Sequence, residues 1–125
     1  MRHRIQVEGH DELFADGPAV VGGDDSAPDP HDYFDMALGA CKAITARMYA
    51  RRKEWPLEGI RVSVDRDDSE ERQGRYRLQV TMEFVGIDDP AQRERLLEIA
   101  DRCPIQRLMT AAQVSVDTGL AGSDA

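Results

Sequence analysis

The stretch HDYFDMALGACKAITARMYARRK, residues 31–53, contains the longest regular pattern of side chains in this chain. Its apolar and small members recur at helical spacing and form one stripe: Phe34, Ala37, Leu38, Cys41, Ile44, Thr45 and Met48. Acidic residues lie near its start and the basic run 51–53 lies at its end, which suits the helix dipole. We therefore expect one long helix over this stretch, ended by Trp55 and Pro56.

The segment before this helix predicts a small meander of short strands. Residues 5–8 and 12–15 flank a turn at 9–11, and a third short strand is expected at 19–21. The segment 22–30 is rich in Gly, Asp, Ser and Pro, so it is expected to form a loop.

Two strands are predicted after the long helix, over residues 60–64 and 76–84. Apolar and polar residues alternate in both, which indicates one buried and one solvated face. The acidic segment between them predicts a long hairpin loop, with Gly74 close to the second strand.

Helical signals return after the second of these strands. Asp88 or Asp89 is expected to cap a second helix that has a proline in its first turn. A short third helix is predicted over 104–109, a final strand over 113–117, and a frayed end over 120–125.

Length, composition and charge narrow the fold and the function classes. The 125 residues, 41% of them apolar, fit a single domain with one core, residues 1–125, and the element order predicts the α+β class. A net charge of −8 argues against a nucleic-acid partner, which requires a basic surface. No apolar run approaches the roughly 20 residues of a membrane helix, and the first six residues contain no apolar signal region. We expect a cytoplasmic protein that does not bind membranes.

The two cysteines lie in different local settings. Cys103 precedes a proline at a predicted helix start, where unpaired backbone N–H groups lower a thiol pKa, and Arg102 and Arg107 are near in sequence. Cys41 lies in the apolar stripe, where desolvation raises a thiol pKa and buried cysteines are common. Spacing alone thus favours Cys103 as the more activated thiol, with Cys41 either a core residue or part of a pocket wall.

Metal and phosphate chemistry receive little support. A site of two cysteines with two of His3, His10 and His31 is conceivable, but no Cys-x-x-Cys or His-x-x-x-His spacing occurs. The sequence contains neither a glycine-rich phosphate loop nor a Gly-x-Ser-x-Gly elbow. We therefore expect no metal and no organic cofactor.

Three motifs carry a family resemblance: PHDYFDMALGAC at 30–41, MYARRK with WPLE at 48–58, and LLEIADRCPI at 96–105. Together with ADGP at 15–18, they resemble the OsmC/Ohr family of thiol-dependent hydroperoxide-reducing proteins, and within it the OsmC-like subgroup. The resemblance extends over roughly residues 10–118.

The resemblance implies an α+β fold in an intertwined homodimer with active sites at the subunit interface. It implies that Cys41 is the peroxidatic thiol and Cys103 the resolving thiol. This reverses the preference for Cys103 as the more activated thiol, which came from sequence position alone. The protein is then expected to be a stress-response peroxidase. It would reduce an organic hydroperoxide or another small apolar substrate, and a dithiol reductant would restore its thiols.

The chain departs from the family pattern near the peroxidatic thiol. In the family that this chain resembles, peroxidase members carry a Glu near the start of the long helix, paired with an Arg from the N-terminal region. Here His31 stands at the matching position with Asp32 beside it, and Arg2 and Arg4 precede the matched segment. We take His31, Asp32 and Arg107 as candidate supporting residues and expect weaker peroxidase activity than in relatives that keep the pair. The alternative function is a non-catalytic dimeric module that binds a small apolar ligand in an interface pocket lined by the cysteines.

Overall fold

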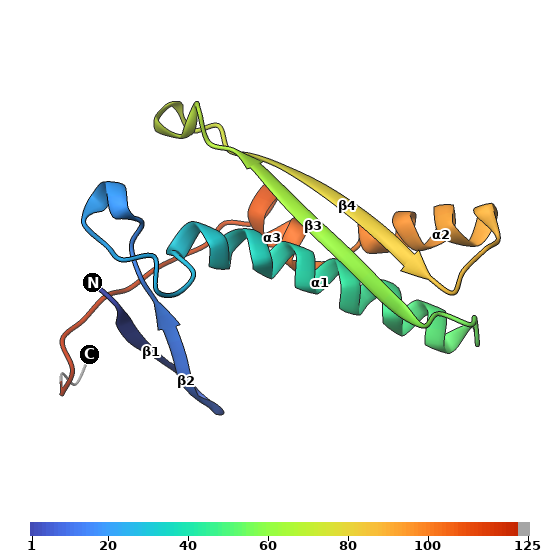
Figure 1. Cartoon of the computed structure of the whole chain (residues 1–125), viewed down its shortest axis with the longest axis horizontal. Coiled ribbons are helices and arrows are strands. Elements are labelled where there is room, and N and C mark those ends of the chain that lie inside the picture. Colours follow the sequence, from blue (N-terminus) through green and yellow to red (C-terminus); the bar gives the residue numbers. More distant parts are fainter. Residues whose placement is uncertain (123–125) are drawn as a thin grey trace.

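The computed structural model describes residues 1–122, and these form an α+β arrangement (Figure 1). The strands are β1 (His3–Val7), β2 (His10–Ala15), β3 (Gly59–Asp67) and β4 (Arg77–Val85). The helices are α1 (Pro30–Arg52), α2 (Pro90–Ala100) and α3 (Pro104–Thr110), with short 3-10 helices η1 (Ala19–Val21) and η2 (Glu71–Gln73). Within the described part of the chain, the strands form two antiparallel pairs, β1–β2 and β3–β4. The predicted α+β class is confirmed.

The start of α1 is set by a complete local cap. The Asp29 carboxylate accepts a hydrogen bond from the backbone N–H of Asp32 at 2.8 Å, and the Asp32 carboxylate accepts one from the N–H of Asp29 at 3.0 Å. Pro30 occupies the first helical position, where its missing N–H costs nothing. The helix predicted over 31–53 is confirmed to within one residue at each end.

The β3–β4 hairpin crosses α1 along one side (Figure 1). Its register is unbroken from the pair Gly59–Val85 to the pair Asp67–Arg77, and alternate side chains of both strands are partly buried. The close approach depends on Gly39, because a Cβ atom there would lie 2.9 Å from Cγ2 of Val64. The predicted alternation thus correctly identified both strands and their inward faces.

The main core lies at the other end of α1, where β4 and α2 meet it. Its buried members are Ala46, Tyr49, Ala50, Phe84, Ile87, Leu96, Ile99 and Ala100. Asp89 caps α2 by accepting from the N–H of Ala91 at 2.9 Å, which confirms the second of the two predicted caps. None of the helices within residues 1–122 combines the length and apolar character that crossing a bilayer requires.

Two predicted strands are wrong. Residues 19–21 form the 3-10 helix η1 instead, because the chain curls back so that the N–H of Gly23 reaches the carbonyl of Pro18 at 3.0 Å. Residues 113–117 form no strand in the structure as described, because they pair with neither β1–β2 nor β3–β4. The fraying expected over 120–125 falls partly on residues 123–125, which lie outside the described residues.

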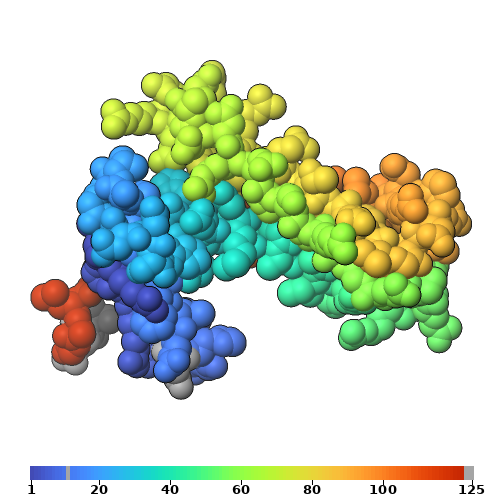
Figure 2. Space-filling model, in the orientation of Figure 1, coloured from blue at the N-terminus to red at the C-terminus, as the bar shows by residue number. Residues whose placement is uncertain are grey.

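The apolar stripe predicted on α1 is largely open to solvent, although its member Leu38 is buried. Phe34, Ile44 and Met48 are 45%, 61% and 65% exposed, because the hairpin and the later helices pack on the neighbouring face. The residues of α1 that are buried are Asp35, Leu38, Gly39, Lys42, Ala46, Tyr49 and Ala50. Figure 2 shows the β1–β2 hairpin as a lobe at one end of α1, with an open notch between it and the rest. A large apolar face of α1 is therefore left open in the single chain.

Candidate functional site

The two cysteines come from different elements, and their thiols are near neighbours. Cys41 is half-buried on α1, and Cys103 is the N-cap residue of α3 and only 1% exposed. Both thiols are free, and Cys41 lies near enough to Cys103 to raise the pKa of its thiol. The structure thus places a half-buried thiol near an almost fully buried one.

The environment of Cys103 overturns the expectation that its helix start activates it. Burial raises the pKa of the Cys103 thiol, and the neighbouring Cys41 raises it further. A hydrogen bond from the backbone N–H of Gln106 to Cys103 Sγ, at 3.4 Å, opposes these effects, and so does the charge of Lys42. Desolvation dominates because the thiol is almost fully enclosed, whereas α3 is only seven residues long.

Lys42 is the functional candidate that sequence reasoning missed. Its ammonium group donates to Oδ1 of Asp101 at 3.0 Å, to the carbonyl of Ala100 at 3.4 Å, and to the side-chain oxygen of Gln106. Lys42 is 5% exposed, so this charge lies inside the protein. The signal that could have found it is its spacing, four residues after Leu38, which also faces inward.

A cavity of about 530 Å³ lies between α1, β4 and α3, and Lys42 forms part of its wall. Its apolar side is provided by Phe34, Leu38, Leu78, Val80 and Met109, and its polar side by Lys42, Gly74, Tyr76, Asp101, Gln106 and Thr110. This size and this mixture of linings are typical of pockets for small molecules.

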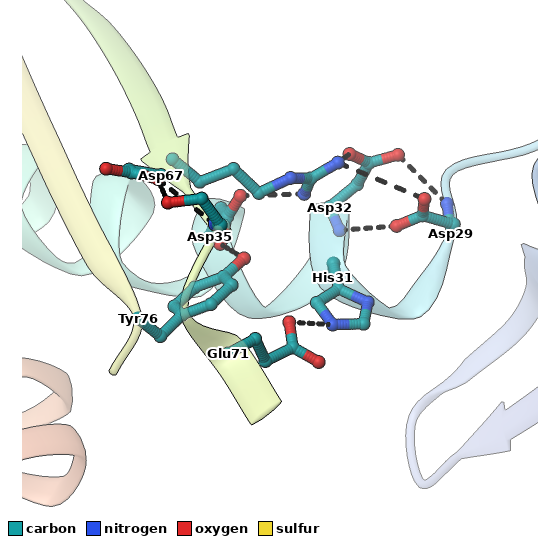
Figure 3. Close-up of polar contacts among 9 residues, drawn as sticks. Asp29, His31, Asp32, Asp35, Asp67, Glu71 and Tyr76 are labelled. Carbon is teal, nitrogen blue, oxygen red and sulfur yellow. Dashed lines mark hydrogen bonds and ion pairs between the residues drawn. The ribbon is translucent and has the colours of Figure 1, made fainter. Parts of the chain in front are cut away.

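A second polar cluster ties β3 and β4 to the start of α1 (Figure 3). The buried carboxylate of Asp35 accepts from Nη1 of Arg66 at 2.8 Å and from the hydroxyl of Tyr76 at 2.7 Å. Nη2 of Arg66 also pairs with Oδ1 of Asp32 at 3.1 Å. The cluster therefore anchors the loop end of the hairpin on α1.

The pKa values within this cluster follow from burial and hydrogen bonding. Burial and the carboxylate of Asp35 raise the pKa of Tyr76 to about 12. Burial alone would lower the pKa of Arg66, but its hydrogen bonds with Asp35, Tyr76 and Asp32 outweigh this and raise it. Arg66 thus stays charged and Tyr76 stays neutral at physiological pH.

Two of the three candidate supporting residues pair with residues of other segments, and the third is exposed. His31 pairs through Nε2 with Oε1 of Glu71 at 2.8 Å, and both side chains are about half exposed. Asp32 takes part in the cap of α1 and binds Arg66, so an arginine of β3 meets the acid at the helix start. Arg107 is exposed on α3, and the cation that acts on Cys103 is Lys42.

No group of three or more His, Cys, Asp or Glu side chains is arranged to hold a metal ion within residues 1–122. The conceivable site of cysteines with His3, His10 or His31 therefore does not form in this part of the chain.

A family model of OsmC-like proteins matches residues 23–119. The chain belongs to the OsmC-like family. No curated protein sequence matches this OsmC-like chain significantly. Among solved structures, it is similar to one from Psychrobacter arcticus, named for an osmotic stress induced and detoxification response protein. That match has 19% identity and a TM-score of 0.70, and it covers 83% of this chain and 76% of the other.

Two further similar structures carry names that refer to organic hydroperoxides. The organic hydroperoxide resistance protein OsmC of Legionella pneumophila has 22% identity and a TM-score of 0.58, covering 80% of this chain and 74% of that one. A protein of Vibrio cholerae, named for organic hydroperoxide resistance and carrying captopril in one of its active sites, has 22% identity and a TM-score of 0.57. It covers 79% of this chain and 71% of that one. At such identities the likeness establishes the fold of the OsmC-like protein.

Proposed function

We propose that this OsmC-like protein is a cysteine-based hydroperoxide reductase with Cys41 as the peroxidatic thiol and Cys103 as the resolving thiol. The observation that carries the proposal is the proximity of two free thiols, one half-buried and one almost fully buried. The names of two similar structures, which refer to organic hydroperoxide resistance, support the same substrate class.

The burial of each thiol matches its proposed role in the cycle. The Cys41 thiolate attacks one oxygen of the hydroperoxide and the O–O bond breaks. The alcohol leaves after taking a proton, and Cys41 becomes a sulfenic acid. The Cys103 thiolate then attacks the Cys41 sulfur, the S–O bond breaks, and hydroxide leaves as water after protonation. A dithiol reductant supplies two electrons and two protons by exchange, which restores both thiols and oxidises the reductant to its disulfide.

The surface around Cys41 suits an organic hydroperoxide. Its neighbours on the open face of α1 are the small Ala37 and the apolar Ile44 and Met48, which offer contact to an alkyl or aryl group. The cytoplasmic location expected from the sequence stays a prediction.

Consumption of cumene hydroperoxide with dithiothreitol tests the proposed activity. The wild-type protein is expected to consume peroxide and dithiol in equal amounts, and Cys41→Ser is expected to fall to the uncatalysed rate. Ser115→Ala, which alters an exposed residue of the C-terminal segment, serves as the control that keeps full activity. A wild-type protein no faster than Cys41→Ser would contradict the proposal and favour the ligand-binding module.

We further infer that the chain works as a homodimer. The open apolar face of α1 includes Phe34, Ile44 and Met48, and β1 is exposed along its whole length. Such contiguous apolar surface is rarely left to solvent in a monomer, and a second copy of the chain would cover it.

Light scattering at micromolar concentration is expected to give twice the chain mass of 14.0 kDa. Ile44→Asp is expected to shift the population towards monomer because it places a charge in the apolar face. Ala91→Asp adds the same charge to an exposed position at the start of α2 and is expected to leave the mass unchanged. A monomer mass for the wild-type protein would refute the dimer.

A further inference from the structure

The position of Lys42 requires a physical reason, because an ammonium group inside a protein loses its hydration. Its three acceptors compensate for this loss, and they lie on both sides of Cys103 in the chain. Ala100 and Asp101 precede Cys103, and Gln106 follows it. Lys42 therefore joins the helix that carries Cys41 to both flanks of the turn that carries Cys103.

Gln106 connects Lys42 to Cys103 more directly still. Its side-chain oxygen accepts from Lys42, while its backbone N–H donates to the Cys103 sulfur at 3.4 Å. One residue thus contacts both the buried cation and the buried thiol. A change at Lys42 is transmitted to Cys103 through this residue as well as through the electric field.

We propose that Lys42 is a positioning residue for the resolving thiol: it holds the turn with Cys103 against Cys41, and its charge stabilises the Cys103 thiolate as this attacks oxidised Cys41. This inference rests on the proposed function, because it assigns a role within that two-thiol cycle. No further co-reactant is needed, since the attack expels hydroxide from the Cys41 sulfenic acid as already described.

Among the charged groups near Cys41 and Cys103, Lys42 is the cation that acts on the Cys103 thiol. Helix α1 contributes Cys41 and Lys42. The turn before α3 contributes Asp101, whose side chain is 73% exposed, so solvent screens its negative charge. From the β4 side, Tyr76 lines the same cavity as Lys42 and stays neutral, with a pKa of about 12. The charge of Lys42 lowers the pKa of Cys103 against the larger opposing effect of burial.

Loss of the charge is expected to slow disulfide closure at neutral pH. Each unit by which the Cys103 pKa rises reduces its thiolate about tenfold below the pKa, while the intrinsic nucleophilicity of the thiolate increases about threefold. Closure is therefore expected to slow about threefold per unit of pKa change below the pKa, and to become faster by about the same factor above it. The Cys41 sulfenic acid would then persist, and a second hydroperoxide would oxidise it to sulfinic acid.

Titration of Cys103 tests the electrostatic half of the proposal without any peroxide. In a Cys41→Ser background, the ultraviolet absorbance of the thiolate reports Cys103 alone. Lys42→Met is expected to raise the midpoint, Lys42→Arg to restore it, and Lys53→Met, at the end of the same helix, to leave it unchanged. Circular dichroism verifies folding, and Lys42→Gln replaces Lys42→Met where the latter does not fold. An unchanged midpoint in the folded variant would overturn the proposal.

The rate of disulfide closure in the protein with both cysteines tests whether Lys42 promotes the attack of Cys103 on Cys41. After one equivalent of cumene hydroperoxide, quenching and mass spectrometry separate sulfenic acid formation from disulfide formation. Lys42→Met is expected to leave the first rate unchanged, slow the second, and move its pH midpoint upward. Closure that is unaffected at every pH would overturn the role of Lys42. If wild-type protein does not react with hydroperoxide, the proposed function fails. Closure is then started with diamide, so that the role of Lys42 is still decided by experiment.

Discussion

Cys103→Ser is expected to turn the protein from a catalyst into a reagent that acts once. One equivalent of hydroperoxide per chain should be consumed in a burst, after which consumption stops. The reason is the order of the steps, because the sulfenic acid on Cys41 forms before the resolving thiol has anything to attack. Mass spectrometry after one equivalent of cumene hydroperoxide should find the added oxygen on Cys41, trapped by a sulfenic-acid reagent such as dimedone.

Cys41→Ser provides the matched control, since it also keeps one thiol of the pair. It is expected to show no burst, because Cys103 is 1% exposed and burial raises the pKa of its thiol. Oxidation of Cys103 in this variant, with peroxide consumption retained, would reverse the two roles. It would instead support the activation of the thiol at the start of α3 that spacing alone favours.

Asp35→Ala is expected to cause the largest loss of stability of a single substitution at the polar cluster. It removes the carboxylate that accepts hydrogen bonds from the Arg66 guanidinium and the Tyr76 hydroxyl. The mostly buried charge of Arg66 then loses one of its anionic partners. Breaking a buried ion pair from one side typically costs 3–5 kcal/mol, and we expect about 3 kcal/mol because Asp32 still binds Arg66. Urea unfolding followed by circular dichroism measures the difference in free energy of unfolding.

Glu83→Ala is the matched control for this experiment, because it removes a carboxylate from another arginine of β3. Glu83 pairs with Arg61 at 3.4 Å, but both side chains are more than half exposed. Screening by solvent limits such a pair to at most about 1 kcal/mol. Equal losses for Glu83→Ala and Asp35→Ala would show that the cluster does not anchor the hairpin on α1.

Most elements of the fold could be predicted because their signals are local. The capping box around Pro30 and the cap at Asp89 depend on residues within a few positions of one another. Alternation along β3 and β4 likewise depends only on neighbouring residues. The strand predicted at 113–117 is absent because a strand also requires a partner strand. A local pattern of residues does not reveal whether such a partner is present.

The motifs around both thiols were sufficient to indicate the family, and the match of the family model over residues 23–119 confirms it. They were not sufficient to place the thiols. About half of the chain, including β3, β4 and α2, lies between Cys41 and Cys103 in the sequence. Their proximity results from the packing of α3 on α1. Spacing therefore predicted an activated Cys103 from its helix start, whereas the packed chain encloses it and raises its pKa.

The sequence by itself determined the helices, the hairpin, the family and the two residues that carry the proposed chemistry. Only the tertiary structure decided which face of α1 is buried, and hence that Lys42 and Asp35 lie inside while Ile44 lies outside. Both polar residues acquire their partners from distant segments, Asp101 and Gln106 for Lys42 and Arg66 and Tyr76 for Asp35. Burial and electric field depend on every group packed nearby, so neither can be deduced from the order of residues along one helix.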